Sequence, residues 1–307
     1  MYIIIGIIRK GHITNNTNSK NIKTNLTESI RKSIRPLSEL NLIDDFLFST
    51  LMETHEYAEK LVKLIIKRTT GREINNFTIE SQKTYNGTDK DKHSIRLDVL
   101  IKVSEDDTIR EVYDIEPNTY YVKDIARRNR YYNALTDSKL LSSNEKYTNL
   151  PELITIWILS YDPFGEKRMI YTIKNIVTEN PDIVYNDGIT TIFLNAKGEI
   201  GGSEELRSLL EYLSSTNDNT AIDTELKDIQ YMVHTIKGDE NVSERYMGMQ
   251  RMVYYEKQMS YEEGEKCGEE RGIQIGENQA KEHIAEKLLE LGVEPAIIKQ
   301  AMEDKNN

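Results

Sequence analysis

The sequence predicts an α/β fold, in which a mixed central sheet is flanked by helices and followed by a helical C-terminal extension. Two β-rich segments, 95–103 and 109–116, are separated by turn residues and predict an antiparallel hairpin. Helices are expected before and after this hairpin, over 38–69 and 119–141. The continuous apolar segment 153–161 predicts a central strand that is buried on both faces.

Composition describes a globular chain with an acidic charge balance. Its 307 residues are 38% hydrophobic and 30% charged, which is typical of soluble proteins with one main domain and an appendage. The single cysteine, Cys267, cannot form an intramolecular disulfide, and this fits a reducing compartment such as the cytoplasm. The net charge of −11 argues against a general nucleic-acid coat protein but is compatible with a local basic patch.

Residues 1–35 are predicted to form a disordered leader, because 11–35 is rich in Asn, Thr, Ser and Lys. The apolar segment 2–8 is too short to span a bilayer. It precedes the basic pair Arg9 and Lys10 instead of following a basic region, so a signal peptide is not expected either. The sequence thus predicts no association with a membrane.

The region before the hairpin predicts two helices and a strand. Ser38 is expected to start the first helix, and Gly71 is a plausible C-terminal stop for the second. Residues 73–82 predict a first strand, which would pair with the hairpin.

The region after 153–161 predicts further strands and then helices. Strands are expected over 168–177 and 189–194. Residues 203–260 are expected to be helical, with breaks at 217–219 and 238–239 where turn-forming residues gather.

The last part of the chain predicts a very polar helix over 261–291. Four of its glycines are spaced by four residues, at Gly264, Gly268, Gly272 and Gly276. Each such glycine costs about 1 kcal/mol relative to alanine, so the stripe predicts either close helix–helix contact in a homo-oligomer or a loosely ordered, solvated tail. A last short helix is expected to start at Pro295.

The length of the hairpin loop decides which residues face each other. With an odd-length loop centred on Asp107, Asp98 lies opposite Glu116, whereas an even-length loop places Asp98 opposite Ile115. Directly opposed side chains have Cβ atoms about 4.5–5.5 Å apart, so two carboxylates there repel each other. A divalent cation that prefers oxygen ligands, Mg²⁺ or Mn²⁺, would stabilise this pair.

Several motifs, taken together, resemble a known family. The hairpin carries R-x-D-V and then I-E-x-N, and the following helix carries R-x-R-Y-Y. Further matching blocks follow the same order at 37–52, 135–152, 161–175, 187–198 and 261–277. The chain resembles the PD-(D/E)XK nuclease family transposases, relatives of the recombination-promoting nucleases, over roughly 37–300.

The resemblance implies a division of the chain and an activity. It implies a restriction-endonuclease-like domain over 36–215, a helical extension over 216–260, and a glycine-punctuated polar helix with a terminal helix over 261–307. The implied activity is metal-dependent cleavage of DNA phosphodiester bonds in the recombination of a mobile element. The implied cofactor is Mg²⁺ or Mn²⁺, and the implied location is the cytoplasm, in association with the nucleoid.

The resemblance also assigns roles to particular residues. Asp98 and Glu116 are the expected metal ligands. Two residues after the glutamate, where this family usually has glutamine and related nucleases have a lysine that orients the water, the chain has Asn118 after Pro117. Alternation along a strand places Glu116 and Asn118 on one face, and Lys102 shares that face with Asp98.

A second motif lies on the first helix. Asp45 and Phe48 match the family pattern D-x-x-F-[basic], but Ser49 occupies the basic position. Asp45 is therefore a candidate catalytic residue. The alternative is an acidic residue that is favourable at a helix N-terminus because of the helix dipole.

Basic and aromatic side chains are gathered around the start of the helix at 119–141. The residues expected to contact the DNA backbone are Lys123, Arg127, Arg128, Arg130 and Tyr131. In the alternative, these arginines pair with acidic side chains and tyrosines such as Tyr132 pack on the sheet.

Two other functions remain open at this level. Pro117, Asn118 and Ser49 depart from the family pattern, which favours a degenerate relative that binds DNA or a protein partner without cleaving DNA. The acidic net charge and the glycine stripe favour an oligomeric interaction protein with no nucleic-acid role.

Overall fold

The computed structural model describes residues 35–86 and 94–303. The predicted leader lies outside the described residues, apart from Arg35. The chain divides into two compact units, one of which is Arg35–Tyr246 and the other of which contains Met247 and the residues after it. The boundaries predicted after residues 215 and 260 do not coincide with this division.

A six-stranded mixed sheet forms the centre of the first unit, so the predicted α/β class is confirmed. The strand order is β1-β2-β3-β4-β6-β5, with β3, β4 and β6 parallel and the other neighbours antiparallel. The strands are β1 (Phe77–Tyr85), β2 (Ile95–Glu105), β3 (Thr108–Asn118), β4 (Glu152–Leu159), β5 (Ile170–Ile173) and β6 (Ile189–Asn195). As predicted, β4 is central and almost wholly buried.

Of the two registers that the sequence leaves open, the β2–β3 hairpin has the one expected for an odd-length loop, although its loop has an even length. Its turn has two residues, Asp106 and Asp107, both with positive φ (48° and 59°), a conformation that Asp tolerates and that matches the twist of a tight hairpin. A β-bulge between Val103 and Ser104 then shifts the register by one residue. Beyond it, Lys102 pairs with Val112, as an odd-length loop would require.

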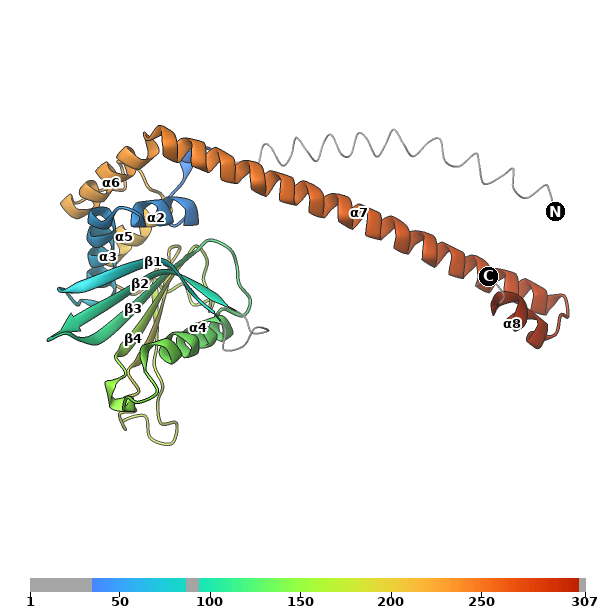
Figure 1. Cartoon of the computed structure of the whole chain (residues 1–307), viewed down its shortest axis with the longest axis horizontal. Helices are drawn as coiled ribbons and strands as arrows, with labels where there is room; N and C mark the ends of the chain where they lie inside the picture. The colour runs from blue at the N-terminus through green and yellow to red at the C-terminus, as the bar shows by residue number, and fades with distance from the viewer. Residues whose placement is uncertain (1–34, 87–93, 304–307) are drawn as a thin grey trace. The chain divides into compact units, whose positions relative to one another are not determined.

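Helices cover both faces of the sheet (Figure 1). One face carries α2 (Asp45–Met52), α3 (His55–Thr70), α5 (Glu204–Ser214) and α6 (Thr224–Lys237), and the other carries α4 (Ile125–Leu140). Gly71 adopts a left-handed conformation (φ 73°) at the end of α3, as predicted. The prediction that Ser38 starts a helix was wrong, because Ser38 lies in a 3-10 turn, Leu37–Glu39, and α2 begins at Asp45.

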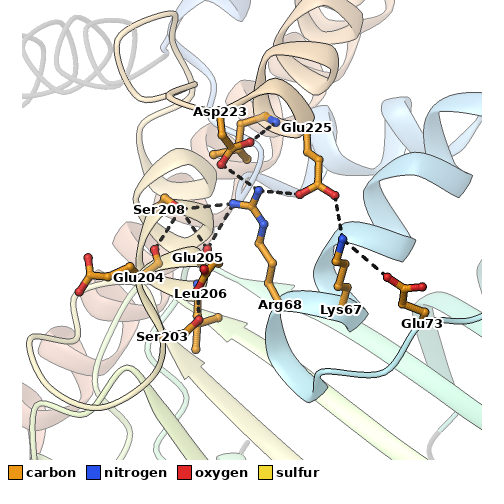
Figure 2. Close-up of polar contacts among 11 residues, drawn as sticks. Lys67, Arg68, Glu73, Ser203, Glu204, Glu205, Leu206, Ser208, Asp223 and Glu225 are labelled. Carbon is orange, nitrogen blue, oxygen red and sulfur yellow. Dashed lines mark hydrogen bonds and ion pairs between the residues drawn. The ribbon is translucent and has the colours of Figure 1, made fainter.

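Arg68 joins three helices of this unit (Figure 2). Its side chain extends from α3 and is only 4% exposed, and its Nη2 atom lies 2.8 Å from Asp223 and 2.9 Å from Glu225. Its Nη1 atom donates to the backbone oxygen of Glu205 and to the Ser208 hydroxyl on α5. The charge of this arginine is therefore balanced within the core.

The described residues of the second unit, 247–303, are mostly helical. The long helix α7 (Glu240–Glu290) includes the predicted glycine stripe, and α8 (Pro295–Glu303) follows a left-handed Gly292 (φ 83°). Apart from the adjacent residues and the backbone of the helix itself, no described atom lies within 4 Å of the position that a Cβ would take at Gly264, Gly268, Gly272 or Gly276. No helix within the described ranges is both long enough and apolar enough to cross a membrane.

Candidate active site

A cavity of about 320 Å³ lies where β2 and β3 meet the start of α2 and the side of α4. Its lining includes the four predicted catalytic residues, Asp45, Asp98, Glu116 and Asn118, and one predicted DNA-contacting residue, Arg128. The remaining lining residues are Ile43, Arg96, Pro117, Thr119, Tyr120 and Tyr132. The hairpin register and strand alternation bring Asp98, Glu116 and Asn118 together. Asp45 lies at the start of α2, which is distant from the hairpin in sequence.

A larger cavity of about 390 Å³ is lined by residues of α3 and α6. Its lysines already have acidic partners, such as Glu59 at 2.7 Å from Lys63 and Glu225 at 3.3 Å from Lys67. The smaller cavity is the better candidate for chemistry, because no described Lys or Arg forms an ion pair with its carboxylates, Asp45, Asp98 and Glu116.

Asp98 and Glu116 are in contact across the two strands. The Asp98 backbone N–H donates to Glu116 Oε1 at 2.8 Å, and Glu116 is only 2% exposed. Burial, and then the negative charge of Asp45, raise the pKa of Asp98 to about 6. Burial, and then the nearby carboxylates of Asp114 and Asp98, raise the pKa of Glu116 well above its usual range. Both groups therefore sit where a carboxylate charge is unfavourable.

Asp114 is a third carboxyl group that the sequence analysis missed. It is 1% exposed, and burial raises its pKa to about 8, although its hydrogen bond with Glu116 acts in the opposite direction. Its Oδ1 atom has no hydrogen-bond partner among the described residues. The signal was present in the sequence, because residues two apart on a strand share a face and Asp114 lies two residues before Glu116.

Arg128 places a positive charge beside these carboxyl groups. Its guanidinium carbon lies 5.0 Å from the ring centre of Tyr132 and 5.2 Å from that of Trp157. Its Nη2 atom donates to the Tyr132 hydroxyl at 2.8 Å. Arg128 opposes the rise in the pKa values of Asp98 and Asp114 through its charge.

Arg96 is the second arginine that lines the cavity, and unlike Arg128 it was not predicted as a site residue. It is exposed, lies two residues before Asp98 on β2, and favours the ionised form of Asp98, so it opposes the rise in that pKa. It belongs to the R-x-D-V motif, and its spacing from Asp98 could have identified it.

The other predicted residues have simple local environments. Asn118 Oδ1 accepts a hydrogen bond from the Tyr120 backbone N–H at 3.0 Å, which stabilises the turn after β3. Asp45 is exposed at the first position of α2, as expected for an acidic residue that favours a helix N-terminus. Lys102 forms an ion pair with Glu80 at 2.6 Å and does not line the cavity.

The predicted DNA-contacting residues separate into two groups. Lys123, Arg127, Arg130 and Tyr131 are exposed and do not line the cavity, whereas Arg128 does. Among the tyrosines, Tyr132 is buried against Trp157, as the alternative interpretation of this helix expected.

The donor set of this cavity fits a hard cation with few protein ligands. Among the described residues, no group of three or more His, Cys, Asp or Glu side chains is placed to hold a metal ion. Mg²⁺ commonly uses one or two carboxylates and completes its shell with waters and substrate phosphates. Asp98 and Glu116 could supply such a pair, and a cation there would offset the charge that raises their pKa values.

No protein-family model matches the sequence, and no curated protein or solved structure is significantly similar to it. The assignment to the transposase-related nucleases therefore stays a proposal. It depends on the motifs of the sequence and on the geometry of the cavity.

Proposed function

We propose that this protein is a metal-dependent DNA endonuclease of the PD-(D/E)XK type, related to the nuclease family transposases and acting in DNA recombination. The observation that carries the proposal is the surplus of carboxyl groups in the cavity. Asp98 and Glu116 touch across paired strands, their pKa values are raised, and a cation would relieve the repulsion between them. The restriction-endonuclease-like fold is part of this proposal.

Asp98 and Glu116 would hold Mg²⁺ or Mn²⁺ through carboxylate oxygens. The bound ion would lower the pKa of a water molecule and offset negative charge on the phosphoryl group. The water oxygen forms a bond to phosphorus while the bond from phosphorus to one sugar oxygen breaks. The water releases a proton to solvent, and the departing sugar oxygen takes one up.

Asn118 would orient the attacking water through its amide group. Its Oδ1 atom already accepts a hydrogen bond from Tyr120, so the Nδ2 atom is the part of the side chain left for this role. The exposed residues of the α4 region, Lys123, Arg127, Arg130 and Tyr131, would contact the DNA backbone and give affinity without sequence selectivity. Such a protein would work in the cytoplasm, in association with the nucleoid.

The alternative is a protein that binds DNA or a protein partner but does not cleave DNA. The observation that favours it is the state of Asn118, which is neutral, follows Pro117 and uses its carbonyl oxygen in a turn. Homo-oligomerisation through 261–291 belongs to both alternatives. Sedimentation equilibrium of the full chain tests it, because a monomeric mass at all concentrations would exclude it.

The decisive experiment is nicking of supercoiled plasmid by the purified protein in Mg²⁺ or Mn²⁺, compared with EDTA. Asp98→Ala and Asp98→Asn remove the proposed ligand, and Arg110→Gln is a matched surface control at the far end of the hairpin. Metal-dependent nicking that both Asp98 variants lose and Arg110→Gln keeps would support the nuclease. DNA retention at low salt without nicking by the wild type would instead support the non-cleaving alternative.

A further inference from the structure

Arg128 differs from the other basic residues of α4 because it is half-buried and lines the carboxylate cavity. Its guanidinium group is stacked against Tyr132 and Trp157, at 5.0 and 5.2 Å from their ring centres. Stacking of this kind fixes the plane of the guanidinium group while leaving the N–H groups on its edge able to donate. Only its hydrogen bond to the Tyr132 hydroxyl is made in the described part of the chain.

A buried polar network fixes the position of α4, and with it that of Arg128. Asn129 accepts a hydrogen bond from Trp157 Nε1 at 2.9 Å and donates one to Thr191 at 2.9 Å. Asn133 accepts another from Thr155 at 2.8 Å. These contacts connect α4 to β4 and β6, so the helix cannot rotate Arg128 out of the cavity without breaking them.

Within the described residues, the charge of Arg128 has no carboxylate partner at ion-pair distance. No carboxylate among residues 35–86 and 94–303 forms an ion pair with it, although it lies close enough to oppose the rise in the pKa values of Asp98 and Asp114. Arg68, the most deeply buried arginine of the other helical face, has two acidic partners within 3 Å. A fixed arginine without such a partner is suited to bind an anion from solution.

The proposed function supplies the anion, a phosphodiester, and the positions of the charges indicate which cation it meets. When a divalent cation neutralises Asp98 and Glu116, a phosphodiester that enters the cavity brings one further negative charge. Arg96 also lines the cavity but is exposed, so Arg128 is the cation that is preorganised to meet this charge.

We infer that Arg128 binds a non-bridging oxygen of the phosphodiester to be cleaved, and that Tyr132 and Trp157 hold its guanidinium group in place for this contact. This inference rests on the proposed nuclease function. It separates Arg128 from Arg127 and Arg130, whose contacts would lie along the flanking backbone.

The test uses Trp157, which is the single tryptophan of the chain and touches Arg128. The full-length protein in Mg²⁺ is titrated with the dinucleotide TpT at constant ionic strength, and tryptophan fluorescence reports binding. Arg128→Lys keeps the charge but loses the planar fork, and is expected to weaken TpT binding about 10- to 100-fold, the range for a lost charge-assisted hydrogen bond. Arg110→Gln is expected to bind TpT like the wild type.

Two further readouts separate a phosphate contact from a structural role. Calorimetric binding of Mg²⁺ and the urea midpoint are expected to be unchanged in Arg128→Lys, while the nicking rate falls at saturating DNA. Unchanged TpT binding in Arg128→Lys, parallel loss of Mg²⁺ binding, or no fluorescence response in the wild type would overturn the inference. Arg128-dependent TpT binding without any nicking would support the contact between Arg128 and a phosphodiester and reject the nuclease proposal.

Discussion

Two regions of the same compact unit bury charge in opposite ways. On the side of α3, α5 and α6, Arg68 meets Asp223 and Glu225 within 3 Å and donates to α5 as well, so positive and negative charges are balanced (Figure 2). At the cavity formed by β2 and β3, Asp98 and Glu116 are lining residues and Asp114 is buried beside Glu116. No Lys or Arg of the described residues forms an ion pair with these three carboxyl groups.

The difference shows which buried charges stabilise the folded chain. A balanced pair joins helices and leaves no charge without a partner, whereas a surplus of carboxylates makes folding less favourable above the pH at which they ionise. Such a surplus persists in a stable protein when something that binds there compensates for it. The contrast therefore predicts opposite effects of substitutions in the two regions.

The largest effect is expected for Glu116→Gln. The amide keeps the shape of the side chain and its hydrogen bond from Asp98, but it removes a metal ligand, so nicking should fall about 1000-fold, or roughly 4 kcal/mol of activation free energy. At a pH where the wild-type Glu116 is ionised, the free energy of unfolding in EDTA should rise, because the substitution removes that buried charge. Plasmid nicking and urea denaturation measure the two quantities, and a variant that is both inactive and less stable would contradict the contrast.

The next effect is expected for Arg68→Met, in the balanced region. The substitution keeps much of the apolar stem but leaves Asp223 without its cation and Glu225 with Lys67 alone, so the free energy of unfolding should fall by about 2–3 kcal/mol. Nicking by the fraction that remains folded should be unchanged. Urea denaturation measures the loss, with the exposed Arg110→Met as the matched control; equal stability of the two variants would show that the Arg68 cluster does not stabilise the unit.

The geometry of the hairpin was partly predictable because it depends on local rules. Strand alternation brings Asp98, Glu116 and Asn118 to one cavity in one of the two registers that the sequence leaves open. The turn has an even length, and a bulge at Arg110 produces the register expected for an odd-length loop. Because Arg110 is not a residue type typical of bulges, the sequence alone does not decide between the two registers.

The arrangement of α4 was not predictable in the same way. The helix begins at Ile125, not at 119, and its rotation on the sheet is set by contacts of Asn129 and Asn133 with strands that follow later in the chain. These long-range contacts decide that Arg128 enters the cavity while its neighbours stay exposed. Sequence spacing alone treated all of these arginines alike.

A smaller effect is expected for the pH dependence of stability. The pKa of Asp114 is raised to about 8 in the folded chain, so its contribution is fully present below its ordinary pKa and is lost as the pH rises toward 8. The wild type in EDTA should therefore become less stable between pH 5 and pH 8. The free energy of unfolding of Asp114→Asn should fall less over this range, by about 1–2 kcal/mol at pH 8, because the amide that replaces the buried carboxyl group cannot ionise.

Urea denaturation at pH 5 and pH 8, with and without Mg²⁺, measures this effect. Mg²⁺ should restore much of the stability of the wild type at pH 8, because a ligand that binds only the folded chain stabilises it. Identical pH slopes for the wild type and Asp114→Asn would show that Asp114 does not carry the surplus charge. Asp107→Asn, at the hairpin turn, is the matched control.

The smallest effect is expected for Asp45→Asn. Asp45 is exposed at the start of α2, and its charge is the second cause, after burial, of the raised pKa of Asp98. Removing that charge should lower the pKa of Asp98 below about 6, and added salt should act in the same direction by screening. Carboxyl-carbon NMR of Asp98 during a pH titration measures this change, again with Asp107→Asn as the control. An unchanged pKa of Asp98 would show that the charge of Asp45 does not raise it. A bound cation would then not need to offset the charge of Asp45.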